Sequence, residues 1–225
     1  MCLLILVQLS DWTGGTGGLF FMPVADTEQN IALEINKEFD PVRIGLISDT
    51  HIPADAKILP PHVTEAFSNL DLIIHGGDIY LSSVLDELEK IAPVIAALGN
   101  DDGNSMDDHR VKKSHVVRIN GLSLGVTHRG YYPGPSELSF EQIMFREFTK
   151  KVDILVFGDT HLPMVAKKDD VLLVNPGSPT VPRGLYALGS VGILEITDNN
   201  IEASIIQLKD MPLPFDRSLI YYPGA

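Results

Sequence analysis

Two short motifs of the sequence, Asp49-Thr50-His51 and Asp159-Thr160-His161, each place an imidazole two residues after a carboxylate. Both groups are common ligands of divalent metal ions. A single D-x-H motif occurs often by chance, but further candidate ligands lie between the two motifs. These are Asp78 and Asn100, each of which follows a glycine, and His128. The ordered series predicts a metal site where no single motif would.

The types and number of these residues indicate which metal chemistry to expect. Carboxylate, amide and imidazole ligands without a thiolate favour hard or borderline ions such as Mn²⁺, Fe or Zn²⁺. The set is too large for one tetrahedral ion, but it fits two ions that share a carboxylate. Paired ions about 3.5–4 Å apart are a usual device for displacement at phosphorus. The seven candidate ligands are Asp49, His51, Asp78, Asn100, His128, Asp159 and His161.

Short apolar runs precede most of these ligands and predict buried strands. The carboxyl ends of strands in open α/β sheets form binding crevices, so the ligands should converge there. Glycine before Asp78, Asn100 and Asp159 would permit the turns that aim them inward. The four predicted strands are Val42–Ser48, Leu72–His75, Val94–Leu98 and Ile154–Phe157.

Helices alternate with strands in the first half of the chain, whereas hairpins dominate the second half. Helical spacing or capping predicts helices over Pro60–Leu70, Leu81–Ile91 and Phe140–Lys150, the last with Ser139 as N-cap. Asn120-Gly121 predicts a hairpin turn. This order favours an α/β fold with mixed sheets. The predicted hairpin strands are Ser114–Ile119 with Leu122–Thr127, Met164–Lys168 with Val171–Val174, and Val191–Thr197 with Ile201–Leu208.

The chain of 225 residues is long enough for one large domain. Residues 1–40 contain a glycine-rich stretch and no clear period, so they are interpreted as an extension without chemistry. The domain itself is expected over residues 41–210, followed by a tail over residues 211–225. The single cysteine, Cys2, falls in the extension and is a poor candidate nucleophile.

The formal net charge of -13 argues against a protein that grips extended nucleic acid, because phosphate backbones would be repelled. No apolar run reaches the roughly 18 residues of a membrane span. The first basic residue is Lys37, so the positive start of a secretory signal is missing. Together with the single cysteine, these features favour a cytoplasmic protein.

The motifs resemble those of the calcineurin-like metallophosphoesterase superfamily. The residues concerned are D-T-H, G-G-D, G-N-D-D, T-H-R-G and G-D-T-H, in that order. Asn175-Pro176-Gly177-Ser178, with Val181-Pro182-Arg183-Gly184, is similar to its small phosphodiesterase branch of the YfcE type. The eukaryotic retromer subunit Vps29 is similar to this branch too. The resemblance covers residues 42–208 and implies two mixed sheets packed as a sandwich flanked by helices, in four layers.

The resemblance also implies a role for each ligand. Asp49, His51 and His161 would hold a first ion, and Asp78 would bridge both ions. Asn100 and His128 would hold the second ion, joined by Asp159. The catalytic set would be Asp49, Asp78, Asn100 and His128. The expected reaction is in-line attack on a small phosphodiester by a hydroxide that bridges the ions. Mn²⁺ is the first expectation, with Ni²⁺, Fe, Zn²⁺ and Mg²⁺ as alternatives.

Two residues depart from the family pattern. Asp159 stands where a further histidine is usual, and its extra charge should favour Mn²⁺ or Mg²⁺ over Zn²⁺. Asp101 stands where many members have a histidine that is a candidate general acid. A protonated Asp101 could donate to the leaving group or contact substrate, but an ordinary turn aspartate is the favoured interpretation. Arg183 is a weaker candidate for contact with the substrate phosphate.

Two other functions stay open at this point. A Vps29-like scaffold with a weakened metal site would use the fold only for binding. A phosphomonoesterase would keep the chemistry and change the substrate. Tyr131-Tyr132 could stack on a base or pack in a loop, and His75 is interpreted as structural. Edge strands late in the chain, and relatives that self-associate, favour a homo-oligomer.

Overall fold

The computed structural model describes residues 7–8, 31–37, 41–103, 106–130, 138–182, 189–197 and 200–208. The predicted tail, Cys2, Tyr131-Tyr132 and Arg183 lie outside these residues, as does most of the predicted extension. Over the described residues, no helix combines the length and apolar character needed to cross a membrane.

The strands form two mixed sheets, which confirms the predicted fold class. Strands β3, β4, β5 and β6 run parallel in the first sheet, whereas β12 is antiparallel to β3 and β13. The first sheet has the order β1 (Val7–Gln8), β13 (Ile201–Gln207), β12 (Ser190–Ile196), β3 (Val42–Ile47), β4 (Leu72–His75), β5 (Val94–Ala97), β6 (Val111–Lys112). The second has the order β10 (Met164–Lys168), β11 (Val171–Asn175), β9 (Ile154–Val156), β8 (Leu122–Thr127), β7 (Ser114–Ile119), β2 (Ile31–Ile35).

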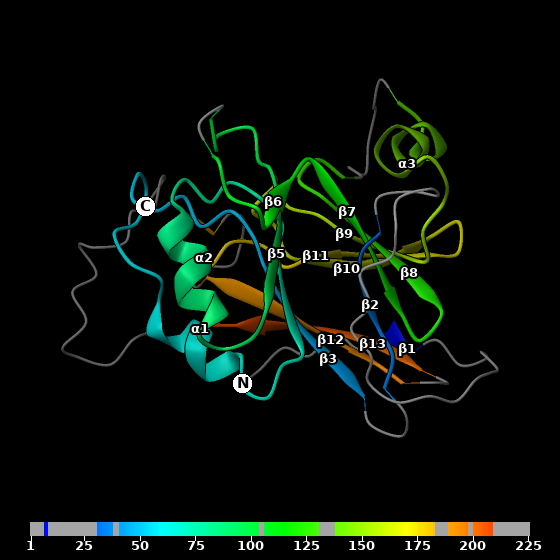
Figure 1. Ribbon diagram of the computed structural model, residues 1–225, viewed down its shortest axis with the longest axis horizontal. Helices are drawn as coiled ribbons and strands as arrows, with labels where there is room; N and C mark the ends of the chain where they lie inside the picture. Colours follow the sequence, from blue (N-terminus) through cyan, green and yellow to red (C-terminus); the bar gives the residue numbers. More distant parts are fainter. Residues whose placement is uncertain are drawn as a thin grey trace.

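Three apolar clusters separate four layers, helix–sheet–sheet–helix (Figure 1). The largest cluster lies between the sheets and includes Leu46, Leu124 and Val174. Helices α1 (Pro61–Ala66) and α2 (Ser82–Glu89) cover the outer face of the first sheet. Helix α3 (Phe140–Phe148) covers the outer face of the second. The sandwich buries both faces of the central strands, which explains why they read as continuous apolar runs.

Local chemistry accounts for several element boundaries. Ser139 caps α3, as the sequence predicts: its Oγ accepts the Gln142 backbone N–H, and its own backbone N–H donates to Gln142 Oε1 in a capping box. Asn120 and Gly121 have φ values of 46° and 83°, the signs that a tight hairpin turn between β7 and β8 requires. Helix α1 is shorter than the predicted range Pro60–Leu70. It ends at Ala66, and Asn69 turns the chain with a φ of 55°.

Strand β2 was not predicted from the sequence. It pairs in parallel with β7 and buries Ile35, which is 2% exposed. Its residues Ile31, Leu33 and Ile35 alternate with Ala32 and Glu34, so a period of two was present in the region interpreted as an extension.

Candidate metal centre

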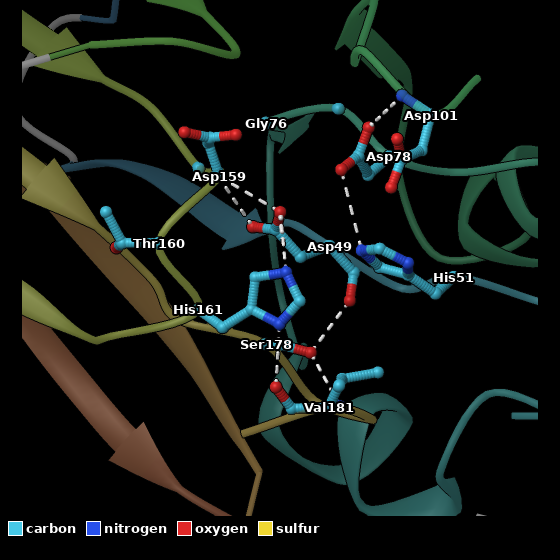
Figure 2. Close-up of polar contacts among 12 residues, drawn as sticks. Asp49, His51, Gly76, Asp78, Asp101, Asp159, Thr160, His161, Ser178 and Val181 are labelled. Atoms are coloured by element: carbon cyan, nitrogen blue, oxygen red, sulfur yellow. Dashed lines mark hydrogen bonds and ion pairs between the residues drawn. The ribbon is translucent and has the colours of Figure 1, made fainter. Parts of the chain in front are cut away.

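The loops that follow strands of both sheets meet at one edge of the sandwich. Asp49 follows β3, Asp78 follows β4 and Asn100 follows β5 in the first sheet, while His128 and Asp159 follow β8 and β9 in the second. The Asp159 backbone N–H donates to both carboxylate oxygens of Asp49, at 3.0 and 3.2 Å (Figure 2). The two sheets therefore build a single site, as their carboxyl ends predicted.

Three overlapping groups of side chains bring their ligand atoms within 4.8 Å of one another. All seven predicted ligands belong to this cluster, since Asn100 Oδ1 lies 3.1 Å and Asp159 Oδ1 3.6 Å from His128 Nε2. The structure adds Asp101 to them, and their function as ligands stays a prediction. The groups are Asp49–His51–His161, Asp49–Asp78–His128 and His51–Asp78–Asp101.

Backbone carbonyls orient two of the imidazoles. His161 Nδ1 lies 2.8 Å from the Val181 carbonyl, and His128 Nδ1 lies 2.8 Å from the Gly76 carbonyl. Because a carbonyl can only accept, each Nδ1 carries a proton and each Nε2 turns to the cluster. His161 Nε2 lies 3.5 Å from Asp49 Oδ1, and His128 Nε2 lies 3.3 Å from Asp78 Oδ2. This is the usual arrangement behind a metal-ligating histidine.

His51 is the observation that best tests whether a metal fits the site. Its side chain is buried, and its Nδ1 lies 3.0 Å from Asp55 Oδ2. Its Nε2 is also buried and lies 3.5 Å from Asp78 Oδ2, but it makes no hydrogen bond with the described residues. A buried polar atom without a hydrogen bond carries a desolvation penalty, which coordination to a cation would offset. The residues present therefore fit a metal ion.

The charges of the cluster lead to the same conclusion. Burial raises the pKa of Asp49 to about 7, partly offset by the nearby His128. Burial lowers the pKa of His128, but hydrogen bonds to the Asp159 and Asp78 carboxylates and the charge of Asp49 outweigh it and raise that pKa to about 10. Without metal, Asp49 and His128 thus hold protons near neutral pH. Dications would supply the missing positive charge and displace those protons.

Most of the candidate ligands sit on unusual backbone. The left-handed region, with φ between 47° and 65°, is rare for residues other than glycine and indicates strain held in place by the surroundings. An added Cβ at Gly99 would overlap the Asp78 side chain, so close approach requires that glycine. The residues with left-handed φ are Asp49, His51, Asp78, Asp159 and His161.

Asp102 is a buried residue that reasoning from the sequence missed. Its carboxylate accepts backbone N–H groups from two loops, those of Gly99 and of the three residues from Asp78 to Tyr80. These bonds hold the loop after β4 against the loop after β5 and so fix Asp78. The second aspartate of G-N-D-D was the only sequence signal for it.

The Asn-Pro-Gly-Ser segment holds both D-T-H motifs. Asn175 Nδ2 donates to the Gly158 carbonyl at 2.8 Å and to Thr160 Oγ1 at 3.0 Å. Ser178 Oγ donates to the Asp49 carbonyl at 2.7 Å. The structure buries Asn175 and Ser178 completely against the loops that carry the candidate ligands.

Two more residues border the cluster. His75 accepts the Gly77 N–H at Nδ1, and burial lowers its pKa to about 3, so it is neutral and supports the loop, in line with its interpretation as structural. Arg129 lies at the outer side, with Nε 3.8 Å from Asp159 Oδ1 and a side chain that is 63% exposed. Arg129 was not singled out from the sequence, and the structure places its guanidinium group close to the candidate ligands.

The family model for the calcineurin-like phosphoesterase superfamily domain matches residues 42–199. The chain belongs to this superfamily. It is 37% identical over 167 residues to a probable metallophosphoesterase of Methanothermobacter thermautotrophicus, which covers 73% of this chain and 91% of that protein. It is 34% identical over 191 residues to the phosphodiesterase YfcE of Escherichia coli K12, at 76% and 95% coverage.

The fold of this chain is similar to solved structures of Vps29. The structure of vacuolar protein sorting 29 from Cryptosporidium parvum aligns with a TM-score of 0.61 at 25% sequence identity. The alignment covers 76% of this chain and 93% of that one. The resemblance to the superfamily and to its YfcE and Vps29 relatives is confirmed. Family membership and the Asp/His groups together indicate a phosphoesterase that binds divalent metal.

Proposed function

We propose that the protein is a phosphodiesterase that hydrolyses small phosphodiesters with two divalent ions. The observation that carries the proposal is the buried His51 Nε2, which has no hydrogen-bond partner among the carboxylates and imidazoles around it. The similarity to YfcE, named as a phosphodiesterase, supports the substrate class. The net charge of -13 favours small substrates over extended nucleic acid.

Each side chain has a part in this proposal. Asp49, His51 and His161 would hold the first ion, Asn100, His128 and Asp159 the second, and Asp78 would lie between them. When bound, the pair would lower the pKa of a water molecule and neutralise charge on the phosphoryl oxygens. The carbonyls of Val181 and Gly76 hold Nδ1 of His161 and His128, so that each Nε2 is directed at the cluster where the ions would bind. Arg129 stands where it could meet a substrate phosphate.

Hydrolysis of bis-p-nitrophenyl phosphate with added Mn²⁺ tests the proposal. We expect metal-dependent turnover by the wild type and none above background by Asp78→Asn. The matched control is Asp169→Asn, which removes an exposed carboxylate from the β10–β11 turn and should keep full activity. Activity on p-nitrophenyl phosphate instead of the diester would support the phosphomonoesterase. Turnover that survives Asp78→Asn or chelation of the metal would contradict the proposal.

A Vps29-like scaffold is the second candidate. It is favoured by the fold similarity and by Asp159, which puts an extra carboxylate where the family usually has a histidine. That carboxylate should favour Mn²⁺ or Mg²⁺ over Zn²⁺. Metal analysis of the wild type and Asp159→His tests this: we expect the variant to gain Zn²⁺ content. Equal Zn²⁺ content and activity in both proteins would contradict the assigned effect of Asp159.

The cytoplasmic location, the homo-oligomer and the domain boundaries belong to the proposal as well. They rest on the sequence features described above. Sedimentation of the purified chain would measure the oligomeric state.

A further inference from the structure

Asp101 is held against the candidate metal centre by two hydrogen bonds. Its backbone N–H donates to Asp78 Oδ1 at 2.9 Å, and its Oδ1 accepts from Asn100 Nδ2 at 2.9 Å. The residue is exposed, yet its carboxylate turns to the side of the loop where His51 and Asp78 lie (Figure 2). An ordinary turn aspartate would not be tied to the cluster in this way.

His51 and Asp78 form with Asp101 a group whose ligand atoms lie within 4.8 Å of one another. The His51 side chain is only 7% exposed, and its Nε2 lacks a hydrogen-bond partner among the described residues. Two carboxylates next to an imidazole nitrogen that makes no hydrogen bond offer three ligand atoms suited to a divalent cation. The unpartnered nitrogen and the held carboxylate are separate observations that point to the same ligand.

We propose that Asp101 is itself a metal ligand, of the ion that His51 and Asp78 hold. This inference rests on the proposed function, because it adds a donor to the first ion of that site. A carboxylate that coordinates a dication stays deprotonated, so Asp101 cannot also serve as the proton donor for the leaving group. The family's usual histidine at this place is thus replaced by a group with a different task.

The added ligand changes which ions fit. Together with Asp49, His51, Asp78 and His161, Asp101 would give the first ion five protein ligands. Mn²⁺ and Mg²⁺ accept six ligands, whereas Zn²⁺ in proteins is usually four-coordinate. Asp101 therefore favours the larger coordination number. Its Oδ1 also accepts the amide N–H of Asn100, and Asn100 Oδ1 lies 3.1 Å from His128 Nε2, where these two residues would hold the second ion.

Titration calorimetry with Mn²⁺ alone, supported by the Mn²⁺ electron paramagnetic resonance spectrum, tests the proposal without reference to activity. The proteins are the wild type, Asp101→Asn, Asp101→Ala, Asp78→Asn and the control Asp107→Asn. Asp107→Asn removes an exposed carboxylate from the same β5–β6 connection. Thermal melting of each variant checks that it folds.

We expect both Asp101 variants to weaken one Mn²⁺ site at least about tenfold and to raise the preference for Zn²⁺ in competition, since outer groups alone already contribute about 10–100-fold. Asp107→Asn should match the wild type. Wild-type Mn²⁺ affinity in both Asp101 variants, with binding lost in Asp78→Asn, would overturn the role of Asp101 and leave the proposed function standing. Unchanged Mn²⁺ binding in Asp78→Asn would overturn both.

Discussion

The two D-T-H motifs adopt the same backbone in very different surroundings. Residues 49–51 have φ values of 55° and 47° at aspartate and histidine, and residues 159–161 have 65° and 58°. The Asp49 side chain is fully buried, whereas that of Asp159 is 26% exposed. The same local sequence thus gives the same turn, while the layers around it decide how much water each carboxylate keeps.

The side chains of the two motifs also contact different partners. His51 Nδ1 meets the Asp55 carboxylate and His161 Nδ1 meets a backbone carbonyl. The Asp49 carboxylate accepts the Asp159 N–H. The Asp159 carboxylate lies between the buried His128, at 3.6 Å, and the exposed Arg129, at 3.8 Å. Asp49 therefore lies at the centre of the cluster and Asp159 at its rim, although His161 of the second motif is buried beside Asp49. Equal motifs in a sequence need not contribute equally to function.

The largest expected effect comes from removing one carboxylate charge from each motif. We expect Asp49→Asn to lower the kcat/KM of metal-dependent diester hydrolysis by at least about 1000-fold and Asp159→Asn by about tenfold, as for central and peripheral groups of a polar site. Water can reach the part-exposed Asp159 side chain and make up for part of the lost carboxylate, but it cannot reach the buried Asp49 side chain. Steady-state kinetics with Mn²⁺ measures both values. Equal losses would remove the distinction between centre and rim.

Much of this arrangement could be predicted from the sequence, for a physical reason. Buried central strands are apolar on both faces, so β3, β4 and β9 were visible as apolar runs. Ligands that directly follow such strands must meet at one edge. That argument predicted the cluster without knowledge of the loops.

The supporting residues could not be predicted in this way. Asp102 and Ser178 act through backbone groups of loops that are distant in sequence, and neither spacing nor composition records those contacts. Strand β2 was missed although it alternates, because it lies at a sheet edge in a region with no other regular pattern. Sequence patterns report burial and local turns, whereas the second layer of a site depends on the packed loops.

The metal-free protein gives a second way to compare the motifs, through stability. The pKa of Asp49 is about 7 in the folded protein, compared with the usual value of 3.8 that applies to the unfolded chain. Between these two pH values the folded chain therefore binds more protons than the unfolded one. Stability therefore falls as pH rises through this window. The asparagine of Asp49→Asn does not titrate, so above pH 7 we expect this metal-free variant to exceed the wild type by about 2–4 kcal/mol in free energy of unfolding.

Urea unfolding in chelator at pH 5 and pH 8 measures this difference, with Asp169→Asn, at an exposed carboxylate, as the control that should change little. Added Mn²⁺ should reverse the order by stabilising the wild type alone. A pH-independent gap between Asp49→Asn and the wild type would show that the buried charge is not the cause.

The threonines at the centre of the motifs offer the smallest and most specific comparison. Gly77 donates to His75 Nδ1, so the His75 proton is on Nε2, 3.2 Å from the buried Thr50 Oγ1 that accepts it. Thr160 Oγ1 accepts from Asn175 Nδ2, which also reaches the Gly158 carbonyl. Thr50→Val therefore leaves the buried His75 N–H without an acceptor. Thr160→Val leaves one part-buried Asn175 N–H and the exposed Leu162 backbone N–H without theirs.

We expect Thr50→Val to lower the free energy of unfolding by about 1–3 kcal/mol and Thr160→Val by less than about 1 kcal/mol. Water can reach the donors left at the part-exposed Thr160, but it cannot reach the buried His75 N–H. Valine keeps the shape of threonine, so packing changes little in either loop. Urea unfolding at pH 8 measures both. A larger loss in Thr160→Val would mean that the rim loop, held by Asn175, depends more on its hydroxyl than the central loop does, and the order of the two motifs would have to be reversed.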